Sequence, residues 1–282
     1  MRKRNNFISV LTMFLAIGFV IIFSRPVKAA ANGVQLKANR TYTAYDVTGD
    51  GMKDKIRIRA ANQTDDEAYT SLTVSVNGKT AYRLKNTRFY NVIANIYTLK
   101  NGQPFLYLYA PADNGDGPVC ALLKYTNGKF RKALDFTEIM AGYGNHRIGE
   151  VTNLKGNKIV ITESIVSYSL GINAINFTYK YVNGKFVPTS RYGSYKEIYS
   201  ADGSSRYFTV NSDLPVYTRP GATAVNTTLK TGSLTKIIKC ALINGKMYIQ
   251  LECDGEIYWI KALENPPISD NEKQFMEVRY AG

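Results

Sequence analysis

A nine-residue segment in the first fifth of the chain, residues 46–54, carries oxygen-bearing side chains at alternate positions. Asp46, Thr48, Asp50 and Asp54 stand at positions 1, 3, 5 and 9 of this segment, and Gly51 at position 6 permits a sharp turn. Oxygens at alternate positions of a tight loop converge, and a hard cation such as Ca²⁺ takes about six to eight of them. The segment therefore predicts one Ca²⁺ site, with these ligands: Asp46, Thr48, Asp50, the carbonyl of Met52, and Asp54.

The alternative for this segment is an Asp/Gly turn that holds no metal. An EF-hand does not fit, because Arg57 stands at position 12 and a strand pattern follows the loop. The loop resembles the Asp-rich calcium loops of FG-GAP and VCBS-type repeats. That resemblance implies a calcium ion that staples a β-hairpin, with function on surfaces elsewhere. A second acidic segment, 113–117, lacks a later carboxylate and is interpreted as a turn.

Aromatic residues near the C-terminus could supply a binding groove. The segments 213–221, 228–237 and 247–261 resemble, in order and spacing, bacterial SH3-like domains. Members of that family often bind peptidoglycan or short peptides. The resemblance suggests a groove lined by four aromatics, each of which could instead be core: Tyr217, Tyr248, Tyr258 and Trp259.

Catalytic patterns are weak, and no catalytic residue is assigned. The only histidine, His146, stands in a glycine-containing loop. A nucleophilic Cys–His pair is conceivable for Cys120, and its histidine could only be His146. The chain has no Gly-x-Ser-x-Gly elbow, no His-Glu-x-x-His pattern and no phosphate-binding glycine loop. Paired carboxylates from distant segments stay open as a route to glycoside cleavage.

The elements that must position these residues are β-strands. Apolar and polar residues alternate through segments such as 55–59, 72–76, 105–109 and 177–181, which predicts half-buried strands. Asn-Gly, the strongest short hairpin signal, precedes lysine four times, at residues 77–79, 127–129, 183–185 and 244–246. We therefore expect an all-β protein: blade-like antiparallel β-meander repeats followed by a small SH3-like β-barrel.

The spacing of the turns suggests the domain organisation. The first three Asn-Gly-Lys turns are 50 and 56 residues apart, and each follows an equivalent loop and strand. We expect a repeat domain over 36–195 and an SH3-like domain over 206–264, with a polar linker around 190–205 and a tail over 265–282. Ordinary antiparallel β-structure with coincidental turns is the alternative to repeats.

The N-terminal segment predicts export. A basic start, an apolar run over 7–23 and small residues at Val27 and Ala29 are typical of a signal peptide, here 1–29. An uncleaved anchor is the alternative, and no later run could span a membrane. Removal of 1–29 takes away five positive charges and no negative one, so the formal net charge falls from +14 to +9.

Three cysteines are too few for a disulfide scaffold. Cys240 and Cys253 flank a hairpin turn, so either a cross-strand disulfide or two buried thiols is expected.

We therefore expect a secreted or cell-wall-associated binding protein without catalytic activity. Its basic character favours a cell-wall polymer or peptide as partner, and its scattered charges in an exported chain argue against nucleic acid. Two alternatives stay open: a secreted wall-lytic or carbohydrate-active enzyme, and an adhesive surface protein whose partner is another protein.

Overall fold

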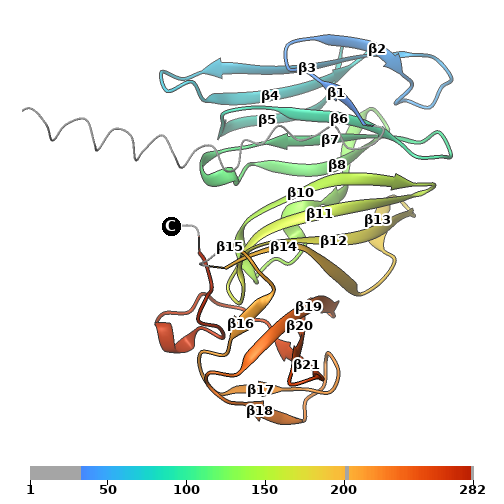
Figure 1. The fold of residues 1–282 in the computed structure, drawn as a ribbon. Helices are drawn as coiled ribbons and strands as arrows, with labels where there is room; N and C mark the ends of the chain where they lie inside the picture. The colour runs from blue at the N-terminus through green and yellow to red at the C-terminus, as the bar shows by residue number, and fades with distance from the viewer. Residues whose placement is uncertain (1–32, 201–202, 281–282) are drawn as a thin grey trace, which may run out of the picture.

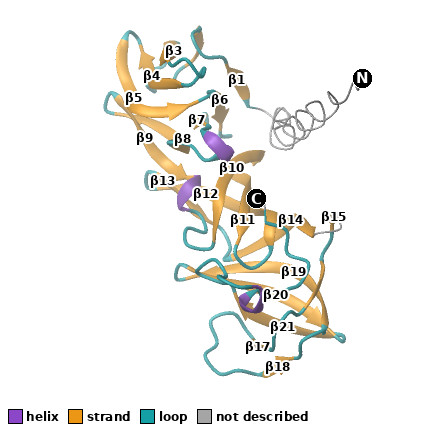
Figure 2. Ribbon diagram, turned by 90° about the vertical axis from the view of Figure 1, so that its left-hand side faces the viewer, coloured by secondary structure: helices purple, strands orange, loops and turns teal. Residues whose placement is uncertain are grey.

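The computed structural model describes residues 33–200 and 203–280. The predicted signal peptide, 1–29, lies outside these residues. The described chain is built from antiparallel β-strands with three short 3-10 turns, which confirms the all-β prediction. Figures 1 and 2 show an elongated molecule in which the sheets follow one another in sequence order.

Three successive four-stranded meanders form the N-terminal two thirds of the described chain. The first comprises β2 (Thr41–Tyr45), β3 (Asp54–Gln63), β4 (Tyr69–Val76) and β5 (Lys79–Phe89). The second comprises β6 (Ile93–Thr98), β7 (Pro104–Ala110), β8 (Val119–Thr126) and β9 (Lys129–Asp135), and β1 (Val34–Leu36) joins its sheet beside β6. The third comprises β10 (Gly144–Lys155), β11 (Lys158–Ser167), β12 (Gly171–Val182) and β13 (Lys185–Pro188). The 3-10 turns η1 (Asp113–Gly115) and η2 (Phe136–Glu138) connect β7 to β8 and β9 to β10.

Most of the remaining strands extend the sheet of the third meander. They are β14 (Tyr192–Ser200), β15 (Gly203–Ser204), β16 (Tyr207–Thr209), β17 (Leu214–Val216), β18 (Thr227–Leu229), β19 (Leu234–Ile243), β20 (Lys246–Cys253) and β21 (Glu256–Lys261), with η3 (Asp270–Glu272) in the tail. The main path of the large sheet is β10-β11-β12-β14-β19-β20-β21. Strands β17 and β18 form a separate pair.

The four Asn-Gly turns adopt the predicted hairpin geometry. Each asparagine has φ between 49° and 51°, and each following glycine has φ between 75° and 88°. Positive φ at both central residues is the requirement of a type I′ turn, whose twist matches that of the flanking strands. These turns link β4 to β5, β8 to β9, β12 to β13 and β19 to β20.

The sheets stack face to face, so the sheet of the second meander is buried on both faces. Side chains of the first meander pack on one face of the second, where Leu106 and Leu108 lie. Phe105 and Tyr107, on the other face of β7, pack into the main core with the third meander and the C-terminal strands. The alternation seen over 105–109 therefore reflects two different apolar faces and not a half-exposed strand.

The prediction of a linker around residues 190–205 is wrong, because most of this segment forms β14. This strand pairs with β12 on one side and with β19 on the other, and Tyr195 and Ile198 lie in the main core. Gly193 is required here: a Cβ at this position would lie 2.7 Å from Cγ2 of Ile175 and would clash with the ring of Phe177. Polar and small residues that suggest a linker locally thus form a strand with one face in the core and the other exposed.

The predicted small barrel is not closed. None of the sheets in the described residues closes on itself, and β19, β20 and β21 extend the large sheet instead. The end of β17 joins β21 only through the bridge between Tyr217 and Trp259. The tail is packed, with Phe275 fully buried against Phe208.

Among the residues that the structure describes, no helix has the length and apolar character needed to cross a membrane.

The placement of β14 predicts that Gly193→Ala destabilises the chain. The added methyl overpacks the contact with Ile175 and Phe177, at a cost of about 1–3 kcal/mol in the free energy of unfolding. Urea denaturation measures this cost. Ser194→Ala, at the exposed next position of the same strand, is the matched control and should change stability by less than about 0.5 kcal/mol. Equal, small effects of both changes would contradict the placement of β14.

Candidate functional site

The acidic loop lies between β2 and β3 and is organised around two carboxylates. Asp54, at the start of β3, is 1% exposed. Its Oδ2 accepts hydrogen bonds from the backbone N–H groups of Val47 (2.6 Å) and Thr48 (2.8 Å), and its Oδ1 accepts one from Nδ2 of Asn77 (2.6 Å). Asp46 accepts from the N–H groups of Gly49 (2.6 Å) and Gly51 (2.8 Å). These donors compensate the two charges and fix the shape of the loop.

Three of the predicted metal ligands converge. Oγ1 of Thr48 lies 3.3 Å from Oδ1 of Asp46 and 3.3 Å from Oδ1 of Asp54. A hydroxyl has one proton and can donate to only one of these oxygens at a time. Asp50 is not part of this group, because its Oδ1 accepts from the N–H of Met52 (2.8 Å) and both residues are exposed. No group of three or more His, Cys, Asp or Glu side chains in the described residues has a metal-binding arrangement.

The electrostatics of the loop favour an ionised Asp46. Desolvation acts to raise the pKa of Asp46, but the N–H groups of Gly49 and Gly51 and the hydroxyl of Thr48 lower it, and the net pKa lies below its ordinary value. A cleft of about 470 Å³ next to Asp46 is also lined by Lys124. Burial lowers the pKa of Lys124, while Asp46 acts to raise it. The loop therefore presents an ionised carboxylate beside a partly buried ammonium group.

The four aromatics predicted to line a groove do not lie together. Tyr217, Tyr248 and Trp259 form a small cluster on the outer face of the β19–β21 sheet, and they are 7%, 6% and 4% exposed. Tyr258 packs against the main core on the opposite face. Adjacent residues of a strand point to opposite faces, so Tyr258 and Trp259 could not share a groove.

An exposed basic face, which the sequence did not reveal, adjoins this cluster. We define the basic face by six residues of β14, β16, β19 and the turn before β14: Arg191, Tyr192, Lys196, Tyr207, Lys236 and Lys239. Tyr192 and Tyr207 are 41% and 54% exposed. The outward alternation of Tyr192 and Lys196 around Ser194 is a strand signal, which the neighbouring glycine and serine obscured.

Aromatic rings contact three of the four cations of the basic face. Nζ of Lys239 lies 4.7 Å from the ring centroid of Tyr192 and 6.0 Å from that of Trp259. The guanidinium of Arg191 lies 5.8 Å from the ring of Tyr192. Nζ of Lys236 lies 5.9 Å from the ring of Tyr207. Cation–π contacts of this kind orient a charge without neutralising it.

Two carboxylates lie near the basic face: Glu252 is opposite Lys236 in the pairing of β19 with β20, and Glu150 interacts electrostatically with Lys196. Within residues 33–200 and 203–280, none of its four cations forms an ion pair. The rings of Tyr192 on β14 and Trp259 on β21 lie close together, with centroids 6.0 Å apart, although β19 and β20 separate the two strands.

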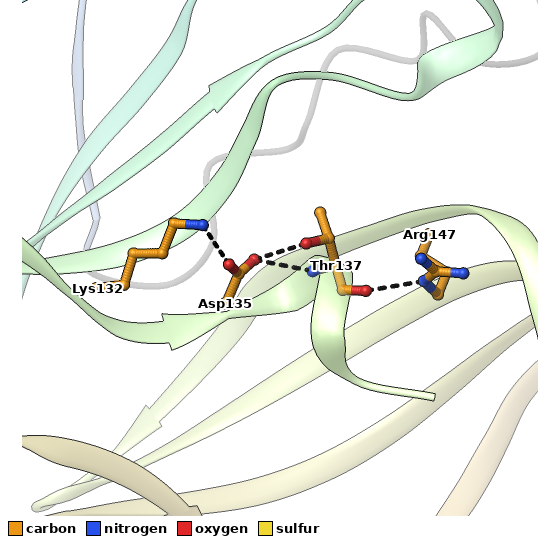
Figure 3. Close-up of polar contacts among 4 residues, drawn as sticks. All are labelled: Lys132, Asp135, Thr137 and Arg147. Atoms are coloured by element: carbon orange, nitrogen blue, oxygen red, sulfur yellow. Dashed lines mark hydrogen bonds and ion pairs between the residues drawn. The ribbon is translucent and has the colours of Figure 1, made fainter. Parts of the chain in front are cut away.

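A cleft of about 600 Å³ lies where the second and third meanders meet the turn between β19 and β20. Figure 3 shows the polar chain beside it. Asp135, which pairs with Lys132, accepts hydrogen bonds from the backbone N–H (3.2 Å) and the hydroxyl (2.8 Å) of Thr137. Nε of Arg147 donates to the carbonyl of Thr137 (2.9 Å). These contacts thus fasten η2 to β10, and the carboxylate of Asp135 at the cleft is paired with Lys132.

Beneath η2 lies a buried carboxyl group without a partner. Glu163 on β11 is fully buried, and neither of its oxygens has a hydrogen-bond partner. Burial raises the pKa of Glu163 well above its ordinary value; Arg147 opposes this shift and Asp135 adds to it. Glu163 therefore holds its proton to a higher pH than an ordinary glutamate does.

The Cys–His pair considered from the sequence has no support in these contacts. Sγ of Cys120 donates to the carbonyl of Gly149 (3.4 Å), and burial raises the pKa of its thiol to about 12. Nδ1 of His146 lies 3.2 Å from Oδ2 of Asp116. A neutral, buried thiol is a poor nucleophile.

All three cysteines are free and buried. Cys240 is opposite Ile249 in the pairing of β19 with β20, whereas Cys253 ends β20. Of the two alternatives for Cys240 and Cys253, the structure has the buried thiols and not the disulfide, because the strand register keeps them apart.

Comparisons of the chain with protein-family models, curated proteins and solved structures give no match.

The burial of Glu163 predicts a pH-dependent stability that Glu163→Gln removes. The folded chain keeps this proton, while the unfolded chain releases it above about pH 4.5. The unfolded state then binds fewer protons, so the contribution of Glu163 to stability falls as pH rises from there toward its raised pKa. Relative to the parent, the free energy of unfolding of the variant should improve by up to about 1.4 kcal/mol per pH unit in this range. Urea denaturation from pH 4 to 8 measures the difference, and a constant difference would contradict a protonated Glu163.

Proposed function

We propose that this chain is an exported, non-catalytic binding protein that holds a cell-wall polymer on the basic face. The observation that carries the proposal is an exposed sheet surface with four cations, none of which forms an ion pair within the described residues. Unpaired, pre-oriented charges next to aromatic rings favour a negatively charged partner. The predicted signal peptide supports a location where wall polymers are that partner.

Rigid strands favour binding by the basic face. Tyr192 and Lys196 lie on β14, which is hydrogen-bonded on both sides, and Lys239 lies on the central strand β19. Side chains on such strands need little reordering when a ligand arrives, which reduces the entropic cost of association. The proposal thus replaces the predicted groove of four aromatics with a neighbouring surface on the same sheet.

We assign Ca²⁺ to the acidic loop in a structural role. The convergence of Thr48 with Asp46 and Asp54 supports the assignment. Asp50 would complete the set by turning from the N–H of Met52 toward the other oxygens. A cation there would tie the β2–β3 connection and add nothing to the basic face, which lies in a different sheet.

The enzyme alternative has less support than binding. The charged groups at the 600 Å³ cleft include a carboxylate, Asp135, already paired with Lys132 and hydrogen-bonded to Thr137. Glu163 is buried without access to solvent. An adhesive role with a protein partner is an outcome that the wall-binding experiment distinguishes.

Reversing two charges of the basic face should abolish wall binding. We expect the mature chain to sediment with purified cell walls, and Lys236→Glu/Lys239→Glu to reduce the bound fraction at least about tenfold, since each like charge opposes the polymer. Lys79→Glu/Lys85→Glu on β5 changes the net charge equally and should sediment like the parent. An equal loss in both double variants would point to net charge alone and contradict the assignment to the basic face.

Calcium should stabilise the mature chain through the acidic loop. At a concentration of Ca²⁺ about 100 times its dissociation constant, the folded state gains about 2.7 kcal/mol. Asp50→Ala should melt like the parent in chelator, because its carboxylate accepts only the Met52 N–H, and should lose the calcium-induced rise in Tm. Thermal denaturation with Ca²⁺ and with chelator measures both effects, and an unchanged Tm of the parent would exclude the site.

A further inference from the structure

We infer that the polymer on the basic face is a polyol-phosphate chain that lies across the strands. This inference rests on the proposed function and specifies its ligand and direction. It is carried by the strand register of the large sheet together with the unpaired cations.

A single row of side chains crosses all seven strands of the main path; it is polar on the first six strands and ends at Trp259 on β21. In the strand register, Glu150 pairs with Thr162, Thr162 with Asn176, Asn176 with Ser194, Ser194 with Lys239, Lys239 with Gln250, and Gln250 with Trp259. A neighbour of each of these residues along its strand lies in the main core. For Ser194 that neighbour is Tyr195, and for the other six the neighbours are, in the same order, Val151, Ile161, Phe177, Cys240, Ile249 and Ile260. The polar row therefore occupies the outer face. Six steps of about 4.8 Å give it a length of roughly 29 Å across the sheet.

The row is most open in its middle. Ser194 is exposed, and Asn176 and Lys239 are partly exposed. Toward one end Thr162 is 3% exposed and its hydroxyl donates to Oδ1 of Asn176 (2.7 Å), while Glu150 beyond it is partly exposed. At the other end the ring of Trp259 is buried beside Tyr192. An extended chain thus has a track from β12 to β19.

The chemistry of the track favours alternating hydroxyl and phosphate groups. The amide of Asn176 and the hydroxyl of Ser194 can exchange hydrogen bonds with hydroxyls. Lys239 follows next in the row, and Lys196 lies on the same strand as Ser194, so cations meet the polar groups at β14 and β19. A phosphodiester that bridges polyols presents both kinds of group in turn.

Neutral glycans and nucleic acids fit the track less well. A neutral glycan leaves the four cations unpaired. Nonspecific binding of single-stranded nucleic acid uses aromatic rings as stacking platforms. Here the exposed rings of Tyr192 and Tyr207 already hold Lys239, Arg191 and Lys236.

Fluorescence anisotropy of the full mature chain with labelled glycerol-phosphate oligomers tests the inference. Affinity should rise with oligomer length until the track is filled and then level off. Ser194→Asp places a negative charge in the middle of the track and should weaken binding about tenfold or more, an effect of about 1.4 kcal/mol. Ser269→Asp, an exposed serine in the tail, adds the same charge and should bind like the parent. Equal Tm values for both variants verify folding.

Three results would overturn the inference: tighter binding of neutral N-acetylglucosamine oligomers, tighter binding of oligothymidylate, or no difference between Ser194→Asp and Ser269→Asp. Sedimentation with walls before and after chemical removal of their phosphate polymers separates the two proposals. Binding that survives the removal contradicts the polyol-phosphate ligand and leaves wall binding intact. A parent chain that does not sediment with untreated walls contradicts the proposed function itself.

Discussion

The pairing of β14 with both β12 and β19 is the constraint on which the rest of this structure depends. It joins the third meander to the C-terminal strands in one sheet and places Tyr195 and Ile198 in the core that both parts share. Without it, the polar row would be interrupted between Asn176 and Lys239. The proposed binding surface is therefore a product of long-range backbone hydrogen bonds and not of any single motif.

Turns and strand faces followed from local sequence, and for clear physical reasons. An Asn-Gly pair tolerates positive φ at both positions whatever surrounds it, so all four predicted hairpins formed. The shape of the acidic loop also depends on local contacts, because the carboxylates of Asp46 and Asp54 accept hydrogen bonds from backbone N–H groups no more than seven residues away. Its calcium stays a prediction, because oxygen ligands can be satisfied by backbone donors as well as by a cation.

The parts that local sequence did not predict depend on contacts between distant residues. Gly193 is small because the rings and methyls of β12 occupy its side-chain space, and the polar residues around it resembled a linker. The expected barrel failed for the same reason: β19 pairs with a strand from outside the predicted domain. The predicted groove of four aromatics, by contrast, conflicts with the sequence itself, because Tyr258 and Trp259 are neighbours on one strand and their side chains must point to opposite faces.

Protection of backbone amides on ligand binding tests the central claim most directly. Hydrogen exchange of the full mature chain, with and without soluble glycerol-phosphate polymer, should slow in segments 174–178, 191–197 and 236–241. The acidic loop over 46–54 and the η2 segment over 135–142 should exchange at unchanged rates. Protection confined to either of those two segments, or absent from β14 and β19, would contradict a polymer bound across the outer face of the large sheet.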